Sequence, residues 1–326
     1  MHDLIMIGSG PSGLSCGLAA EKAGLKYILL EKSCITNSIY NYPISMVFFT
    51  TRELIEIDNY PLTIVNAKPT REEALRYYSR FVSDHKIKIK TYEEVLSVEG
   101  QNGHFKVTTK ILSGETNKYS TKKIVFATGV FDNPQMLDVE GEKLLKVSHY
   151  YKEAHPYAGK KVLVIGGRNS AAESALDLYR NNVEVTLAVR EDAFSHLKYW
   201  VKPDLLNRIK EGSIQCYYRS LVKEIREHDV DLSLEDGSTL TLENDFVLAL
   251  TGFKPNGKLL RGLGVQINDG DLKPEHDPET FETNVSGAYI AGVITAGMES
   301  SLVFIENGRF HGEKIIPHII ESLKQD

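Results

Sequence analysis

The stretch KKVLVIGGRNSAAESALDLYRNNVEVTLAVR, residues 160–190, predicts a strand, a glycine-containing loop, a helix and a second strand in that order. Residues 162–165 form a short apolar run, as expected for a strand that is buried on both faces of a parallel sheet. Two glycines follow this run, a helix is predicted through about Tyr179, and residues 183–189 form the second apolar run. This succession is typical of a βαβ unit whose loop and helix N-terminus bind phosphate.

A similar segment, HDLIMIGSGPSGLSCGLAAEKAGLKYILLEK, opens the chain at residues 2–32. Its loop fits the pattern G-x-G-x-x-G, in which the first glycine makes a tight turn, the second lets the backbone approach a pyrophosphate, and the third allows close packing of helix and strand. A tight turn without a ligand is the alternative. Because the flanking strand, helix and strand are in register, we predict a dinucleotide site here, with contacts from Gly8, Gly10, Pro11, Ser12 and Gly13.

The two copies differ in the residue that ends the second strand. Glu31 ends it in the first copy, where a carboxylate accepts hydrogen bonds from ribose hydroxyls. Arg190 ends it in the second copy, and a guanidinium suits a ribose 2′-phosphate. We therefore predict NADPH at the second copy and a nucleotide without that phosphate at the first. The alternative for Arg190 is a solvated charge at a strand end.

The second loop departs from the glycine pattern, because Arg168 stands where the second glycine usually lies. Its guanidinium adds positive charge for phosphate binding. The predicted contacts of this site are Gly166, Gly167, Arg168, Asn169, Ser170, Ala171 and Arg190. Two dinucleotide sites in one chain predict hydride transfer between two cofactors, and the usual pairing is FAD at the N-terminal site with NADPH at the inserted one.

Bulk composition restricts the function classes. The chain has 326 residues, enough for two domains, with 42% hydrophobic residues and a net charge of −6. This acidic balance argues against a nucleic-acid or anionic-membrane partner, and no apolar run is long enough to span a bilayer. Three widely spaced cysteines, Cys16, Cys34 and Cys216, favour a reducing cytoplasm over a disulfide framework. We predict no metal site.

Three further motifs, together with the two glycine loops, indicate how the chain is divided into domains. They are IVFATG at residues 124–129, FVLALTG at 246–252 and ETNVSGAYIAG at 282–292. With the two glycine loops, they resemble the thioredoxin-reductase-like flavoproteins of the pyridine nucleotide oxidoreductase superfamily. The resemblance implies an α/β fold with two Rossmann-like dinucleotide-binding domains, the NADPH domain (153–253) being inserted into the FAD domain (1–152 plus 254–326).

A narrower resemblance is carried by NSIYNYP from Asn37, KVSHYY from Lys146, KYWVKPDLLNRIKEGSI from Lys198 and FIENGRFHGE from Phe304, which are similar to the YpdA-type flavoproteins. Those proteins are described as NADPH-dependent reductases of bacillithiol disulfide. The resemblance implies electron transfer from NADPH through FAD to a low-molecular-weight thiol disulfide or related acceptor, and a homo-oligomer. It adds expected flavin contacts at Lys32, Asn37, Ser38, Ile39, Asn41, Thr128, Gly129, Gly292 and Val293.

The sequence departs from the motifs of these flavoproteins in three features. The C-x-x-C motif of thioredoxin reductases is absent from the sequence, which excludes their dithiol relay. Ser12 stands where YpdA-type proteins carry a cysteine, and a serine forms no mixed disulfide. Val293 stands where the broader family has an aspartate, so it replaces that residue only through its backbone N–H. The catalytic residues stay unassigned, and the candidates are Ser12 and Cys34.

Other segments allow two interpretations each. A helix expected from about residue 300 to 323 either stabilises charge on the flavin by its N-terminus or simply closes the FAD domain. Tyr40 and Tyr42 either shield the flavin or pack in a loop. Thr70 or Arg71 either contacts FAD or caps a surface helix. Proton donors near the flavin, or ordinary structural residues, are His149, His155 and His311.

Two other functions remain open at this stage. A flavin monooxygenase or NADPH oxidase would use oxygen as the acceptor, and the lack of an obvious redox thiol favours it. The class B monooxygenase signature F-x-G-x-x-x-H between the nucleotide motifs is absent, which counts against it. A redox-sensing module that binds nucleotides without turnover is the third function.

Overall fold

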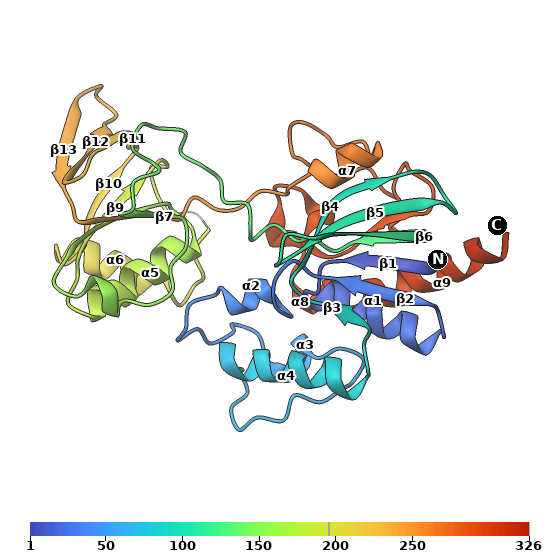
Figure 1. The fold of residues 1–326 in the computed structure, drawn as a ribbon. Helices are drawn as coiled ribbons and strands as arrows, with labels where there is room; N and C mark the ends of the chain where they lie inside the picture. Colours follow the sequence, from blue (N-terminus) through green and yellow to red (C-terminus); the bar gives the residue numbers. More distant parts are fainter. Residues whose placement is uncertain (195, 326) are drawn as a thin grey trace. The chain divides into compact units, whose positions relative to one another are not determined.

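The computed structural model describes residues 1–194 and 196–325, which form two compact units (Figure 1). The first unit comprises residues 1–41, 46–133 and the chain from 253 onward, and the second comprises residues 42–45 and 134–252. Both units combine helices with sheets that contain parallel strands, which confirms the expected α/β class.

The first unit is built on a mixed sheet in the order β3–β2–β1–β6–β5–β4, with β15 also paired to β6. Central β1 runs parallel to both of its neighbours, so that Ile5 pairs with Ile28 on one side and with Ile124 on the other. Residues 4–7 of β1 are buried because the strand is covered on both faces. The strands are β1 (His2–Ile7), β2 (Tyr27–Leu30), β3 (Ile89–Lys90), β4 (Glu93–Glu99), β5 (Phe105–Ile111), β6 (Thr116–Phe126) and β15 (Ala288–Ile290).

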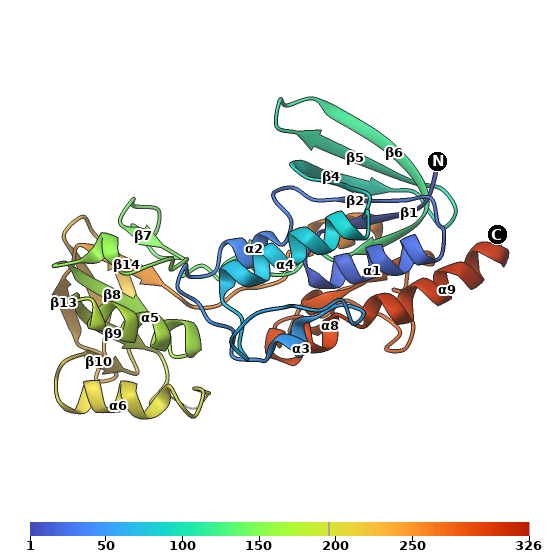
Figure 2. The same cartoon turned by 90° about the horizontal axis from the view of Figure 1, so that it is seen from below.

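Helix α1 (Pro11–Lys22) follows the first loop and packs against C-terminal helix α9 (His311–Gln325), and Figure 2 shows the two side by side. Gly312 permits their close approach, because a Cβ there would lie 2.5 Å from Ser15 O. The Ser15 hydroxyl donates to Arg309 O at 2.5 Å. The unit also contains α2 (Asn37–Tyr40), α3 (Arg52–Ile55), α4 (Arg71–Asp84), α7 (Lys258–Leu263), α8 (Ile305–Gly308), η2 (Gly292–Ala296) and η3 (Ser300–Leu302).

The second unit is built on a parallel sheet in the order β10–β9–β8–β14–β7. Residues of β8 alternate between two apolar clusters: Val162 and Val164 pack with helices α5 and α6, and Leu163 and Ile165 pack with β11 and β12. Figure 1 shows these layers on opposite faces of the sheet. The elements are β7 (Val147–Ser148), η1 (His155–Tyr157), β8 (Lys161–Ile165), α5 (Asn169–Arg180), β9 (Glu184–Val189), α6 (Lys202–Lys210), β10 (Gln215–Tyr218) and β14 (Phe246–Ala249).

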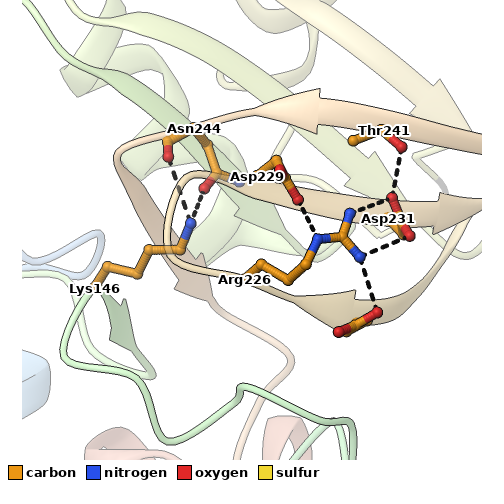
Figure 3. Close-up of polar contacts among 7 residues, drawn as sticks. Lys146, Arg226, Asp229, Asp231, Thr241 and Asn244 are labelled. Carbon is orange, nitrogen blue, oxygen red and sulfur yellow. Dashed lines mark hydrogen bonds and ion pairs between the residues drawn. The ribbon is translucent and has the colours of Figure 1, made fainter.

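A small antiparallel sheet, β11 (Leu221–Ile225), β12 (Asp229–Ser233) and β13 (Thr239–Glu243), completes this unit. Its polar face is organised by Arg226, which donates to Asp229 at 2.5 Å and to both carboxylate oxygens of Asp231 at 2.7 and 2.9 Å (Figure 3). This pairing, together with the Thr241 hydroxyl, lowers the pKa of Asp231 to about 2. Lys146 reaches across to the Asn244 side chain and so ties the segment before β7 to the end of this sheet.

The packing differs from two expectations. Residues 134–152 belong to the second unit rather than to the first, because β7 pairs with β14 and Leu137 and Val139 pack on the cluster under the small sheet. The single helix expected over residues 300–323 is divided into η3, α8 and α9. Asn307 explains one division, since its amide accepts the Phe304 N–H at 2.8 Å and donates to Leu302 O at 2.8 Å in competition with helical bonding.

No helix within the described residues combines the length and the apolar character that crossing a membrane requires.

Candidate functional site

The first glycine loop closes over the end of the neighbouring strand β6. Gly8 has φ +104°, and a Cβ on it would lie 2.4 Å from Ala127 O, so only glycine fits this turn. A Cβ on Gly13 would lie 2.1 Å from Gly8 O, which fixes the contact between α1 and the loop. These contacts place the loop at the carboxyl edge of the sheet, where nucleotides bind in doubly wound folds.

The start of α1 is open to a ligand. Gly10 is the N-cap residue, it makes no side-chain capping bond, and a Cβ built on it would meet no described atom within 4 Å. Pro11 occupies the first helical turn, where its missing N–H is not needed. The residues of this loop therefore fit a dinucleotide, because the helix N-terminus has no side-chain cap and no described atom occupies the position of a Cβ on Gly10.

Glu31 holds the loop as well as closing the site. Its Oε2 accepts the Ser9 N–H at 2.8 Å and the Ser9 hydroxyl at 3.0 Å, and its Oε1 accepts the Ser33 N–H at 2.9 Å. Thr36 N–H donates to Ser9 O at 3.2 Å, so Ser9 is fixed from two sides. Glu31 is only 7% exposed, which leaves a buried acceptor beside the loop.

The expected flavin-covering segment begins as helix α2 rather than as a loop. The Asn37 amide contacts Asp132 at 3.5 Å, and Lys32 forms an ion pair with the same carboxylate at 2.9 Å. Asn41 donates to Asn37 O at 2.9 Å, which closes the turn. Ile39 is buried and Ser38 is half-buried, so the segment is packed on the first unit by its apolar side chain.

Ser12 lies where two distant glycines approach α1. A Cβ on Gly292 would lie 2.9 Å from Ser12 Oγ, and one on Gly308 would lie 2.7 Å from it. The structure thus brings Ser12 together with Gly292 of the expected C-terminal flavin motif. Val293 is half-buried in η2, beside Gly292. Thr128 and Gly129 follow Ala127, the residue that contacts Gly8, and are half-buried.

His311 fixes the Gly292 turn. Its Nδ1 accepts the Gly292 N–H at 3.0 Å, and its ring stacks on Phe281 with 4.2 Å between ring centroids. Burial lowers the pKa of His311 to about 4, so the ring is neutral at physiological pH with its proton on Nε2. This state argues against the interpretation of His311 as a cationic proton donor.

The second glycine loop repeats the geometry of the first. Gly166 has φ +142°, and a Cβ on it would lie 2.5 Å from Leu250 O, the residue after β14. Arg168 corresponds to Gly10, since it is the N-cap residue of α5, and its φ of −107° is extended backbone that any residue adopts. An arginine therefore fits here without strain, and its side chain is exposed at the helix start.

Asn169 is bonded to the chain itself. Its Oδ1 accepts the Lys198 N–H at 2.8 Å, and its Nδ2 donates to His196 O at 3.4 Å. Ser170 is exposed at the start of α5 and Ala171 is fully buried under it. A Cβ on Gly167 would lie 2.9 Å from Val189 Cγ1, and exposed Arg190 follows Val189 directly. The loop and the charge that ends β9 are thus neighbours.

The cysteines are free thiols without the environment that produces a thiolate. Burial, helped by the Glu31 carboxylate, raises the pKa of Cys34 above its ordinary value. Burial raises the pKa of Cys16 to about 12 and that of Cys216 to about 11. Cys16 is fully buried. Cys34 therefore lacks the lowered pKa that characterises reactive cysteines.

The remaining candidates have structural partners. Thr70 forms a capping box with Glu73, and Arg71 donates to Tyr40 O and lies over the exposed Tyr40 ring at 5.4 Å. His149 Nε2 lies 3.3 Å from Glu142 Oε1, and His155 is exposed at the start of η1. Within the described chain, no cluster of three His, Cys, Asp or Glu residues is arranged to hold a metal ion.

Three residues have roles in this site that the sequence did not predict. Ser9 occupies an unspecified position of the glycine pattern, yet both its N–H and its hydroxyl donate to Glu31. Asp132 follows the ATG turn and anchors Lys32 and Asn37. His311 was considered as a proton donor, not as the acceptor for Gly292. No local pattern signals these roles, because each depends on a partner distant in the chain.

Each unit contains one strand–loop–helix–strand segment, β1–α1–β2 in the first and β8–α5–β9 in the second, which we call the first and second cradle. The two cradles define an α/β protein of the dinucleotide-binding oxidoreductase class. The family model for pyridine nucleotide-disulphide oxidoreductases matches residues 5–292. The chain belongs to this family. Membership implies the use of a flavin and a nicotinamide nucleotide, and it disfavours a module without turnover.

Proteins similar to this chain carry related names. It is 40% identical over 317 residues to the Bacilliredoxin reductase Bdr of Bacillus subtilis, covering 97% of this chain and 96% of the relative. The Bacillithiol Disulfide Reductase Bdr (YpdA) from Bacillus cereus is 39% identical with a TM-score of 0.96, over 98% of this chain and 99% of that one. Its counterpart from Staphylococcus aureus is 36% identical with a TM-score of 0.93, over 98% of both chains.

Proposed function

We propose that the chain is an NADPH-dependent FAD oxidoreductase that reduces a low-molecular-weight thiol disulfide of the bacillithiol type, or the disulfide of a bacilliredoxin. The observation that carries the proposal is the pair of matching cradles, closed by Glu31 in one unit and by Arg190 in the other. Two relatives that match nearly the whole chain support this acceptor class by their names, one a bacilliredoxin reductase and the other a bacillithiol disulfide reductase.

FAD is assigned to the first unit. The open N-terminus of α1 at Gly10 suits the pyrophosphate, and Glu31 retains acceptor capacity for ribose hydroxyls beside the Ser9 bonds. Val293 offers its backbone N–H to the flavin side of the same loop, next to the Gly292 turn that His311 fixes. Lys32, Asn37, Ser38, Ile39, Asn41, Thr128 and Gly129 complete the proposed contacts.

NADPH is assigned to the second unit, where Gly166, Gly167 and the start of α5 suit the pyrophosphate. Arg168 lies within this loop and Arg190 follows the strand beside it; both are exposed cations that complement the phosphates of NADPH.

The reaction balances as NADPH, one proton and RSSR giving NADP⁺ and two RSH. FAD, held by the first loop, would supply a two-electron carrier between NADPH and the disulfide. The chain itself binds and orients the two nucleotides. Ser12 supplies no thiol at the first loop, and the raised pKa of Cys34 leaves it protonated at neutral pH. The proposal therefore assigns no protein disulfide to the route.

The decisive experiment is anaerobic. NADPH is expected to bleach the bound flavin faster than NADH does, and addition of bacillithiol disulfide is expected to restore the oxidised spectrum with two thiols per NADPH. Reduction without reoxidation by any disulfide, followed by reoxidation on admitting oxygen, would favour the oxidase or monooxygenase alternative. A protein that binds no flavin would overturn the proposal as a whole.

We propose a homo-oligomer, which light scattering at several concentrations tests. The three free cysteines suit the reducing cytoplasm in which we place the enzyme.

A further inference from the structure

Residues 196–200 are fastened to the start of α5 by three polar contacts. Asn169, the first residue of the helix, binds the Lys198 N–H at 2.8 Å and His196 O at 3.4 Å. One turn further along the helix, Glu173 forms an ion pair with Lys198 Nζ at 2.7 Å. These contacts hold the segment beside the N-terminal turn of α5, next to the second glycine loop.

The segment presents an aromatic pair to solvent. Tyr199 is 83% exposed and Trp200 is 47% exposed, and their rings meet edge to face with 4.8 Å between centroids. Lys198 Nζ lies 5.6 Å from the Trp200 ring centroid. The neighbouring Phe194 and Val201 are buried and anchor the segment at both ends. Burial in the core therefore does not account for Tyr199 and Trp200.

We propose that Asn169 is a positioning residue, which holds residues 196–200 so that the Tyr199–Trp200 pair forms an aromatic wall for the adenosine half of NADPH. This inference rests on the proposed assignment of NADPH to the second unit. The wall lies on the adenosine side because Asn169 holds the segment at the start of α5, and the loop that precedes this helix contacts Val189, the neighbour of Arg190. A purine base stacks favourably on an aromatic ring.

Trp200 is the only tryptophan in the sequence, so its emission reports on the wall directly. Adenosine 2′,5′-bisphosphate, which is the adenosine half of NADPH, is expected to change the tryptophan emission of the holoenzyme saturably. Nicotinamide mononucleotide, the other half, is expected to leave it unchanged. Trp200→Phe is expected to abolish the signal while calorimetry still detects binding.

Tyr199→Ala tests the wall without risk to the fold, since the side chain is largely exposed. It is expected to weaken adenosine 2′,5′-bisphosphate binding by roughly 5-fold to 100-fold, the range for loss of one stacked base. The KM for NADPH is expected to rise in step while kcat is retained. Turnover with reduced nicotinamide mononucleotide, which has no adenosine, is expected to stay at the wild-type rate.

Asn169→Ala tests the positioning role, and Asn181→Ala is its matched control at the other end of α5, where Asn181 donates to Asp177 O at 2.8 Å. Asn169→Ala is expected to reduce the emission change and raise the KM for NADPH by about 10-fold, as for loss of one to two hydrogen bonds. Asn181→Ala is expected to behave as wild type.

Two outcomes distinguish a failure of the aromatic wall from a failure of the proposed function. If adenosine 2′,5′-bisphosphate binds with no change in Trp200 emission and Tyr199→Ala binds it equally well, the aromatic wall is wrong and the proposed function stands. If NADPH neither binds nor reduces the flavin, the proposed function and the wall fail together.

Discussion

One carboxylate oxygen of Glu31 binds Ser9 twice, accepting its N–H at 2.8 Å and its hydroxyl at 3.0 Å. The acid that closes the first cradle is therefore also the support of its glycine loop. Glu31→Ala is expected to raise the Kd for FAD by roughly 10-fold to 100-fold, because hydrogen bonds to a charged group contribute about 1.5–3 kcal/mol. Flavin absorbance per protein after gel filtration measures the loss. Exposed Glu99→Ala, at the end of β4, is the control, and equal flavin content in both variants would contradict the assignment.

Arg190 sets the expected choice of nicotinamide nucleotide. Arg190→Ala is expected to raise the KM for NADPH by roughly 10-fold to 100-fold, as for loss of a charge-assisted bond to phosphate, and to leave the KM for NADH unchanged. Steady-state flavin reduction with each nucleotide measures the ratio. Arg180→Ala removes an exposed guanidinium at the end of α5, paired with Asp204 at 2.6 Å, and is expected to keep the wild-type preference. An unchanged preference in Arg190→Ala would remove the reason for assigning NADPH.

The pKa of His311 gives a pH dependence to stability. The folded chain keeps this ring neutral down to pH about 4, whereas in the unfolded chain it takes up a proton near 6.5. Its contribution is therefore complete above pH 6.5 and is lost as the pH falls towards 4, a total of about 3 kcal/mol. Asn accepts the Gly292 N–H without titrating, so His311→Asn is expected to flatten this part of the profile. Urea unfolding across that range measures it, and identical slopes in both proteins would disprove the interpretation.

Gly308 makes room for Ser12. A Cβ on Gly308 would lie 2.7 Å from Ser12 Oγ, so Gly308→Ala is expected to cost about 1–3 kcal/mol of unfolding free energy. The double variant Ser12→Ala/Gly308→Ala removes the opposing oxygen and is expected to recover most of this loss. Gly262→Ala in α7, where a Cβ meets no described atom within 4 Å, is the control and is expected to be neutral or slightly stabilising. Thermal unfolding compares wild type, Ser12→Ala, Gly308→Ala, the double variant and the control, and additive effects of the two changes would mean that the residues do not interact.

Cys34 is expected to be a slow nucleophile. Burial raises its pKa, so the rate of iodoacetamide alkylation at Cys34 is expected to rise at a higher pH than for a free thiol. Cys34→Ser is accordingly expected to retain disulfide-dependent NADPH oxidation. Peptide mapping identifies the alkylated site, and fully buried Cys16 is expected to react only after denaturation. Rapid modification of Cys34 at neutral pH, with loss of turnover, would restore it as a catalytic candidate.

The local sequence alone determined the two cradles. The apolar runs, the glycines and the helix between them predicted β1–α1–β2 and β8–α5–β9 closely, because each element depends on residues adjacent in the chain. Gly24 lies just beyond the first helix with φ +68°, a backbone conformation that glycine adopts readily at a helix end. Of the two interpretations given for Thr70, the helix cap is present as a capping box with Glu73.

Tertiary structure alone decided the partners of these residues. Asn169 lies in a phosphate-loop pattern, yet its side-chain amide binds Lys198, 29 residues further along the chain. Ser12 contacts two glycines from near the C-terminal end of the chain. The assignment of residues 134–152 depended on a pairing of β7 with β14 about a hundred residues later (Val147 with Val247). Such contacts leave no periodic trace, because hydrogen bonding and packing between distant segments depend on where the fold places them, whereas turns and helix starts are fixed by the torsions of neighbouring residues.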